Sequence, residues 1–401
     1  MTQTGSPRKK SATKKSTPEK AAPVTAAPVT AAKVYFVSLR ARGPKENKIT
    51  KIGSLFAKAG FDARIPKDGL TAVKVHVGER GNDTFLNPVF VRKVVECVKA
   101  AGGKPFITDS NTLYKGSRHN AVDHMITAIE HGFGYATVGA PFIVADGLRS
   151  TSYEEVKIGK KHFKSVKIAA SIAAAQSMIV LSHFKGHEMA GFGGAIKNLA
   201  MGCTPSQGKC DQHASKFFVT EDKCIHCGAC IASCPQDAIA YVKREKSKVA
   251  SINKDKCIGC GECMTVCKPK AISINWKTEL APFNERMAEY ALGAVAGKEK
   301  HVGYINFLLN ITPDCDCVPW SDSPIVPDIG ILASTDPVAL DSACLDLVTK
   351  AVAHEHSQLQ CCHGSGEEKF TGLWKYTCGD VQLTHAENIG LGSRKYELVE
   401  L

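Results

Sequence analysis

The sequence lacks a long apolar run, because no stretch of eighteen consecutive apolar residues occurs in its 401 residues. A helix that crosses a bilayer needs about 20 such residues, so we expect no membrane span. The N-terminus also lacks the charged and then apolar pattern of a secretion signal, and we expect a cytoplasmic protein. Aromatic residues are scarce at 7%, but apolar residues reach 44%, which suffices for a sizeable core.

Acidic residues are too few to balance the basic ones, and the formal net charge is +12. Residues 1–33 hold seven basic side chains and one acidic side chain, so this segment carries +6 and the remaining 368 residues carry the other +6. The segment is rich in Lys, Ser, Thr, Ala and Pro, a composition that cannot build a core. It predicts a disordered basic tail over residues 1–33.

From Val34 onward, apolar strand patterns alternate with helical patterns. The helical pattern that begins near Pro337 has Asp336 at its N-cap and proline at its first position, which is a typical helix start. Strand patterns fall at 34–39, 70–78, 104–110, 141–147, 177–184, 302–310 and 328–334. This alternation predicts an α/β fold with a mostly parallel sheet and helices on both faces.

The alternation stops between residues 217 and 276, where cysteine becomes frequent. Two four-cysteine motifs repeat there at an offset of 33 residues: Cys224, Cys227, Cys230 and Cys234, then Cys257, Cys260, Cys263 and Cys267. Three thiolates at this spacing wrap one [4Fe–4S] cluster, and the fourth cysteine reaches the other cluster. We therefore predict one cluster on Cys224, Cys227, Cys230 and Cys267, and a second on Cys257, Cys260, Cys263 and Cys234.

The duplicated motif resembles the bacterial two-cluster ferredoxins. One departure is that Lys268 follows Cys267, whereas Pro235 follows Cys234 directly. A zinc module is the alternative, but zinc sites built from paired C-x-x-C knuckles would leave the third and fourth cysteines of each motif unused. We therefore expect a ferredoxin-like insert at 217–276, placed between the two parts, 34–216 and 277–401, of one α/β domain.

A second set of candidate residues follows predicted strands of the α/β domain. His183, Lys185 and His187 share one face if the extended geometry of their strand continues. A glycine-rich turn at 191–194 then leads to Lys197 and Asn198. Such a turn suits either an anion at a helix N-terminus or a tight structural turn. Two further strands carry polar groups. Lys74 and His76 share one face of the strand at 70–78, which suits either the lining of a cleft or a solvated edge strand. Asp109 ends the strand at 104–110, which suits either a ligand site or a helix cap.

Cys315 and Cys317 occupy another loop after a strand. Paired thiols bind a soft metal or take up two electrons as a disulfide. Because strand ends in a parallel sheet open onto the ligand crevice, we predict one site that combines this pair with the catalytic candidates His183, Lys185, His187, Lys197 and Asn198. The alternative is that the histidines and lysines make separate hydrogen bonds and the thiols are spectators.

Several segments resemble the domain-of-unknown-function 362 family: KVHVGE, HFKGHEMAGFGGAIKNLAMGC, PDCDC, IVPDIGILASTDPVALDSACLDLV and HAENIGLGSRKYEL. The resemblance covers nearly everything after the basic tail. It implies an iron–sulphur protein in which a two-cluster ferredoxin insert interrupts one α/β domain. It implies no particular reaction.

The leading hypothesis is an electron-transfer protein or a reductase component, with a redox partner protein and a small-molecule substrate. A metal-handling or enzyme-maturation factor is the alternative, and a redox-sensing regulator is the second alternative. Two oxidised clusters with their thiolates would each carry about −2, which lowers the charge of the folded body to about +2. We therefore expect no nucleic-acid partner.

Overall fold

The computed structural model describes residues 1–2, 31–214, 216–234, 236–244, 248–257, 259, 261–275 and 277–401. Most of the predicted tail therefore lies outside the described residues. The first strand, β1, begins at Ala32, so its first two residues fall within the segment that we expected to be a tail. All that follows concerns residues 31–401, which form one compact unit.

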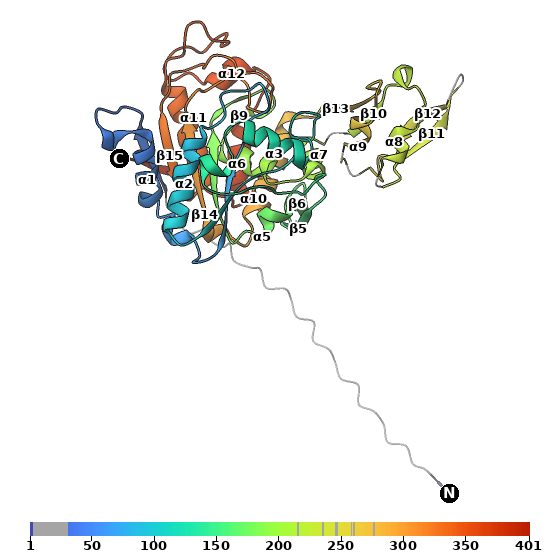
Figure 1. The fold of residues 1–401 in the computed structure, drawn as a ribbon, viewed down its shortest axis with the longest axis horizontal. Helices are drawn as coiled ribbons and strands as arrows, with labels where there is room; N and C mark the ends of the chain where they lie inside the picture. The colour runs from blue at the N-terminus through green and yellow to red at the C-terminus, as the bar shows by residue number, and fades with distance from the viewer. Residues whose placement is uncertain are drawn as a thin grey trace. The chain divides into compact units, whose positions relative to one another are not determined.

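An eight-stranded sheet forms the centre of this unit, in the order β16-β1-β15-β14-β7-β2-β3-β4 (Figure 1). From β14 to β4 the neighbouring strands are parallel, whereas β15 runs antiparallel to both β1 and β14. The strands are β1 Ala32–Ser38, β2 Leu70–Val75, β3 Lys104–Asp109, β4 Phe142–Val144, β7 Ser177–His183, β14 Val302–Leu308, β15 Gly330–Ser334 and β16 Tyr396–Glu400.

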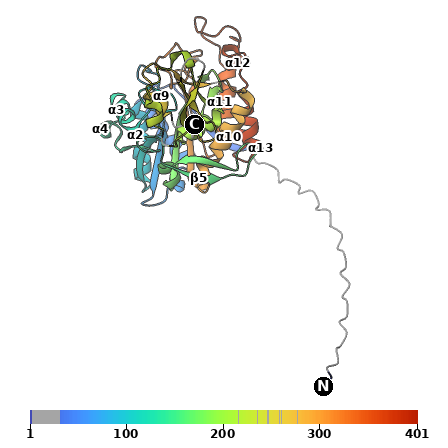
Figure 2. The same cartoon turned by 90° about the vertical axis from the view of Figure 1, so that its right-hand side faces the viewer.

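Helices cover both faces of the sheet because successive strand residues point to opposite sides. On β7, Ile179 and Leu181 pack in the core beneath α1 and α2, whereas Met178 and Val180 pack in the core beneath α6, α10 and α11. Figure 2 shows α2 on one side and α10, α11 and α13 on the other. The helices are α1 Lys48–Lys58, α2 Pro88–Ala100, α6 Ala195–Gly202, α10 Leu280–Val295, α11 Pro337–Lys350 and α13 Asp380–Asn388.

This architecture confirms the predicted α/β class. The start of α11 also matches its prediction, since the Asp336 side chain accepts hydrogen bonds from the backbone N–H groups of Val338 and Ala339. Shorter elements complete the domain: α3 Ala121–Glu130, α4 Tyr135–Val138, α5 Ala170–Ala174, α7 Ser206–His213, α12 Lys369–Leu373, β5 Tyr153–Lys157, β6 Ser165–Ala169, β8 Lys185–His187 and β9 Gly191–Gly193. In the parts of the chain that the structure describes, no helix is long and apolar enough to cross a membrane.

Residues 216–275, which we name the cysteine module, fold as two similar halves. The first half contains β10 Lys216–Val219, α8 Ala229–Ala232 and β11 Ile239–Lys243; the second contains β12 Lys248–Ile252, α9 Glu262–Thr265 and β13 Ile272–Asn275. Each half donates its first strand to the last strand of the other, since β10 pairs with β13 and β11 with β12. The halves are therefore related by a pseudo-twofold arrangement.

The backbone of the module repeats at the same offset of 33 residues as the cysteines. Left-handed conformations occur at His226 and Gly259, at Gly228 and Gly261, and at Asp237 and Lys270. Gly228 and Gly261 are the N-caps of α8 and α9. The sequence duplication therefore corresponds to a duplication of local structure.

Candidate functional site

A cavity with several charged side chains among its lining residues opens at the carboxyl ends of the parallel strands, where an α/β sheet places its ligands. It holds about 910 Å³ of empty space, part of which is open to solvent. Lys74 and His76 extend from β2, Asp109 and Ser110 from β3, and Ser182 and His183 from β7. Helix α6 adds Lys197 and Asn198, helix α7 adds Lys209 and His213, and the loop after β14 adds Cys317.

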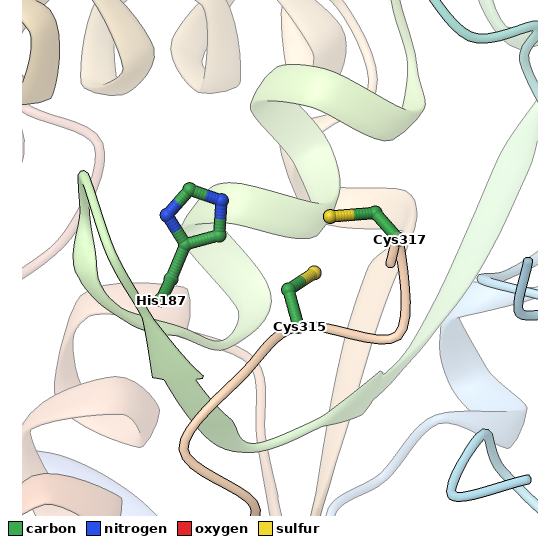
Figure 3. A group of neighbouring side chains, drawn as sticks. All are labelled: His187, Cys315 and Cys317. Atoms are coloured by element: carbon green, nitrogen blue, oxygen red, sulfur yellow. The ribbon is translucent and has the colours of Figure 1, made fainter. Parts of the chain in front are cut away.

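Two thiols and one imidazole meet in this region (Figure 3). His187, Cys315 and Cys317 each place a ligand atom within 4.8 Å of the other two. His187 lies on β8, which pairs with β9, and both cysteines come from the loop after β14. Lys197 donates a hydrogen bond of 3.4 Å from its Nζ to the Cys315 sulfur. The backbone N–H of Gly186 donates to the carbonyl of Thr312 at 2.8 Å, which holds the loop against β8.

The two sulfurs share one proton unequally. The hydrogen bond from Cys317 is the first cause that holds the pKa of Cys315 well below the ordinary thiol range, and Lys197 and Lys185 add to it against the opposing effect of burial. The same hydrogen bond, followed by burial, raises the pKa of Cys317. Burial opposes the charge on Lys197, but the nearby sulfurs outweigh it and raise the pKa of that ammonium group. The pair therefore favours one thiolate, paired with Lys197, and one thiol.

The tautomer of His187 follows from its hydrogen bonds. The Nδ1 atom accepts backbone N–H groups from Met189 and Ala190, both at 3.1 Å. Burial and the charge on Lys197 hold the pKa of His187 well below its usual value, so the ring is neutral. A neutral imidazole whose Nδ1 accepts must carry its proton on Nε2. Figure 3 shows the Nε2 edge of the ring facing the sulfurs.

This tautomer bears on metal binding at the three residues. A histidine that ligates a metal through Nε2 must leave that atom unprotonated and normally donates from Nδ1. Here two backbone donors already face Nδ1. The three groups are close enough for a metal site, but the hydrogen bonds to Nδ1 favour the tautomer that keeps its proton on Nε2.

His183 and Lys185 hold the thiol loop through Asp316. The His183 Nδ1 lies 2.9 Å from both carboxylate oxygens of Asp316, and its Nε2 lies 2.8 Å from the carbonyl of Leu309. The Lys185 ammonium lies 3.6 Å from the same carboxylate and donates to the backbone carbonyl of His183. Both nitrogens of His183 are thus engaged with the loop, which gives this residue a positioning role.

A second charged network lines the opposite wall of the cavity around Asp109. Its carboxylate lies 3.0 Å from the Lys74 ammonium and 3.6 Å from the Arg118 guanidinium. Burial opposes ionisation of Asp109, but Lys74 and the other cationic neighbours outweigh burial and hold its pKa below the usual range. Lys74 also donates to the Asn198 side chain at 2.7 Å, and Arg118 pairs with Glu79 at 3.3 Å.

Lys209 differs from the other basic residues of the cavity. Its ammonium donates to the Ser110 hydroxyl at 2.8 Å and to the Thr204 carbonyl at 2.6 Å. Among the described residues, no carboxylate lies within 4.0 Å of it, whereas Lys74, Lys185 and Arg118 each have one. Burial lowers the pKa of Lys209 to about 8. This lysine therefore brings a positive charge to the cavity without a direct ion pair, and the more distant Asp146 and Asp109 only partly offset the effect of burial.

The glycine-rich turn before α6 does receive an anion, but the anion belongs to the chain. The Asp341 carboxylate of α11 accepts the backbone N–H groups of Ala195 and Ile196 at 2.8 and 2.9 Å. Burial nevertheless raises the pKa of Asp341 to about 6. Of the two interpretations left open for this turn, the structure favours the structural one, because the helix N-terminus is already occupied.

The structure thus brings together His183, Lys185, His187, Lys197 and Asn198 with Cys315 and Cys317, as one site requires. Sequence reasoning missed Asp316, which lies between the two cysteines and connects them to His183, and it missed Lys209, Arg118 and Glu79. The Cys-Asp-Cys spacing was a usable signal for Asp316. Lys209 gave no signal, since α7 is buried on nearly all sides and its sequence has no apolar periodicity.

A separate cavity of about 350 Å³ lies within the cysteine module. The four cysteines predicted to share the first cluster line it together: Cys224, Cys227, Cys230 and Cys267. The backbone N–H of Ala271 donates to the Cys267 sulfur at 3.2 Å, and the N–H of Ala238 donates to the Cys234 sulfur at 3.3 Å. Cys263 lies in the core of the module, Cys234 and Cys257 pack against that core, and Cys260 lies outside the described residues.

The chain belongs to the DUF362 family, since residues 71–346 match the family described as a domain of unknown function. No curated protein matches the sequence. A structure of the lactate racemase apoprotein from Thermoanaerobacterium thermosaccharolyticum is similar at 10% identity, with a TM-score of 0.31 over 64% of this chain. The match spans about half of that protein, at 49% of its length. At this score the likeness carries no inference about fold or activity.

Proposed function

We propose that this protein is an iron–sulphur reductase or reductase component, in which two [4Fe–4S] clusters in the cysteine module supply electrons to the cavity of the α/β domain. The observation that carries the proposal is that two segments of the chain separate the cysteine module from the cavity and contact both. Loop 110–119 and helix α7 each contact the second cysteine motif on one side and line the cavity on the other. Electrons that reach that motif would therefore have a short protein path to the cavity.

Loop 110–119 contributes Leu113 to both contacts. Leu113 is 2% exposed, lines the cavity and packs in the core of the cysteine module with Cys230 and Cys263. Its backbone carbonyl would lie 3.6 Å from a Cβ at Gly261, the residue two positions before Cys263. The second motif is therefore in contact with a residue of the cavity.

Helix α7 contributes neighbouring residues to the two sides. Lys209 and His213, which are four positions apart and so share one helix face, line the cavity. Cys210 faces the second motif, because a Cβ at Gly259 would fall 2.6 Å from its sulfur. The salt bridge from Arg149 to Glu262, at 3.5 Å, adds a further contact between the domain and this motif.

The case for clusters rests on the duplicated motif, the duplicated backbone and the four cysteines around the module cavity. Bound clusters of this type accept and release one electron each, at potentials that depend on hydrogen bonds to sulfur and on burial. The backbone donors to Cys234 and Cys267 are hydrogen bonds of that kind. Zinc bound by paired C-x-x-C knuckles is disfavoured because three of the four cysteines around this cavity, Cys224, Cys227 and Cys230, come from a single motif.

A redox partner protein fits the opposite end of the module. Cys227 of the first motif is exposed, and the neighbouring side chains of Ile225, Phe218 and Tyr241 are 62%, 45% and 40% exposed. Apolar groups around an exposed cysteine suit a transient protein contact. We infer that electrons enter at the first motif and leave through the second.

The experiment that tests the proposal is iron and sulfide analysis of anaerobically purified protein, together with electron paramagnetic resonance. We expect about eight iron and eight sulfide per chain and two reducible centres. Saturation at about four iron, or stoichiometric zinc in their place, would contradict it. Metal-handling is the second candidate function, favoured by the 4.8 Å grouping of His187, Cys315 and Cys317. It predicts an additional metal that the Cys315→Ser variant loses.

A further inference from the structure

The proposed supply of electrons to the cavity gives no role to two of the cavity's thiols. Cys315 is 1% exposed, Cys317 lines the cavity, and their sulfurs lie within 4.8 Å of each other. Lys197 and the Nε2 edge of His187 face them from two further sides. A pair of close thiols with built-in cation and hydrogen-bond partners has the arrangement of a redox-active dithiol, in which one sulfur is a nucleophile and the other resolves the intermediate.

The charge of the cavity indicates what kind of molecule would enter it. Five lining residues are basic: Lys74, Arg118, Lys185, Lys197 and Lys209. Three of them are paired with Asp109, Glu79 and Asp316. Lys197 is engaged with the thiol pair and Lys209 has only neutral acceptors. The cavity therefore favours an anionic ligand, held by Lys209 near Ser110 and reaching toward Cys317.

We propose that Cys315 and Cys317 form a redox-active dithiol that reduces small anionic disulfides, and that the cysteine module returns the pair to its reduced state. The electron supply in this proposal rests on the proposed function, whereas the thiol chemistry can be tested without it. The two-electron capacity of the pair would match two one-electron centres in the module.

The exchange is balanced in atoms and electrons. The dithiol holds one proton, which rests mainly on Cys317. That proton passes to the Cys315 thiolate before Cys317, the sulfur that lines the cavity, attacks as a thiolate. The Cys317 sulfur attacks one sulfur of the substrate, the substrate S–S bond breaks, and the first half leaves as a thiolate that takes the proton from Cys315. The Cys315 thiolate then attacks the Cys317 sulfur, and the second half leaves as a thiolate. The products are one thiol, one thiolate and the Cys315–Cys317 disulfide.

The return step consumes two electrons and one proton. The S–S bond between Cys315 and Cys317 breaks, the electrons arrive one at a time through the cysteine module, and the proton is bound again between the two sulfurs. Lys197 stabilises the negative charge that remains, since its ammonium group donates a hydrogen bond to the Cys315 sulfur. The cavity then has its starting charge.

The test uses the full-length, anaerobically purified holoprotein and two disulfides of opposite charge. Dithiodiglycolate carries two carboxylates, and cystamine carries two ammonium groups. We expect dithiodiglycolate to be reduced at least about tenfold faster, and Lys209→Met to narrow that difference. Mass spectrometry should find the Cys315–Cys317 disulfide after reaction. Equal rates for the two probes would overturn the anionic substrate class, and absence of the disulfide would overturn the dithiol.

Single cysteine variants separate the two sulfurs. Cys315→Ser should trap the substrate half as a mixed disulfide on Cys317, whereas Cys317→Ser should give no adduct at position 315. Cys97→Ser, in a half-buried thiol on α2 outside the cavity, is the matched control. Iron content and melting temperature report whether each variant is folded, and an adduct in the control but not in Cys315→Ser would refute the assignment.

A reductive titration distinguishes failure of this inference from failure of the proposed function. Oxidised wild-type protein should take up about four electron equivalents per chain, two for the clusters and two for the disulfide, and Cys315→Ser about two. If both take up about two and hold full iron, the dithiol is wrong while the clusters stand. If iron is absent, the proposed function fails, and the mixed-disulfide result decides the thiol chemistry alone. A stoichiometric metal lost in Cys315→Ser would also overturn the dithiol.

Discussion

Replacement of Gly186 by alanine should move the thiol loop without unfolding the protein. Gly186 is the central residue of β8, between Lys185 and His187. A Cβ at this position would fall 2.9 Å from the backbone carbonyl carbon of Pro313 and closer still to its carbonyl oxygen. Ordinary contacts between carbon atoms are about 3.5–4.0 Å, so one backbone must move by roughly 0.5–1 Å. Backbone atoms cannot relieve the overlap by a change of rotamer, as a side chain can.

The displacement has two measurable consequences. Overpacking of this kind costs about 1–3 kcal/mol, which corresponds to a melting temperature lower by a few degrees in a chain of this size. The loop carries Cys315 away from the Lys197 ammonium, now 3.4 Å distant, and so removes part of the support for its thiolate. We expect alkylation of the Cys315–Cys317 pair by iodoacetamide at pH 7 to slow by about tenfold, the ratio that corresponds to a loss of about 1.4 kcal/mol.

The assay compares Gly186→Ala with Gly43→Ala. Position 43 has extended backbone, and no atom lies within 4 Å of a Cβ built there, so alanine should be neutral. Alkylation is followed by mass spectrometry of the peptide that contains Cys315 and Cys317, and iron content is measured in parallel. If the two variants alkylate at the same rate, the close approach of β8 to Pro313 does not set the position of the thiols, and the reasoning is refuted.

Three further predictions follow from other parts of the structure. The pKa of Lys209 is about 8 in the folded chain against 10.5 for an ordinary lysine, so the folded chain releases the proton first and wild-type stability should rise with pH between these values. The difference in free energy of unfolding between wild type and Lys209→Met should therefore change in favour of wild type by about 2 kcal/mol between pH 7 and pH 9.5. No change in that difference would show that Lys209 is solvated as in the unfolded chain. Cys267→Ser should lower iron from about eight to about four per chain and expose Cys224 to alkylation while Cys257 stays protected; the reverse pattern would rule out crossed ligation. Removal of residues 1–30 should leave iron content and melting temperature unchanged, as its composition predicts, and aggregation of the shortened chain would contradict this.

Local patterns in the sequence were enough for the parts of this protein that depend on local physics. The start of α11 follows from Asp336 and Pro337 alone, because a cap and a first-turn proline act within three residues. The repeat of the cysteine module was visible at an offset of 33 because each half must present the same backbone turns, and the left-handed residues recur at that offset. The α/β class followed from the alternation of strand and helix patterns.

Part of the candidate site could be predicted from the sequence, and the rest depended on the tertiary structure. The expectation that β7, β8 and the loop after β14 share one crevice rested on a general property of parallel sheets, and the structure places His187, Cys315 and Cys317 within 4.8 Å. Which groups are charged and which are hydrogen-bonded was decided by partners distant in sequence. Asp316 meets His183 across 133 positions, and Asp341 occupies the N-terminus of α6 across 146 positions.

Tertiary structure alone decided the contact between the cysteine module and the cavity. No pattern in the sequence indicates that Leu113 reaches both, or that Lys209 faces the cavity while the adjacent Cys210 faces the second motif. Helix α7 is buried on nearly all sides, so its residues alternate between polar partners on different elements instead of following an amphipathic period. The sequence by itself determined the parts and their local structure, and it predicts the chemistry of the cysteines. The packing of distant segments decided which of those groups share an environment, because burial and charge depend on neighbours in space.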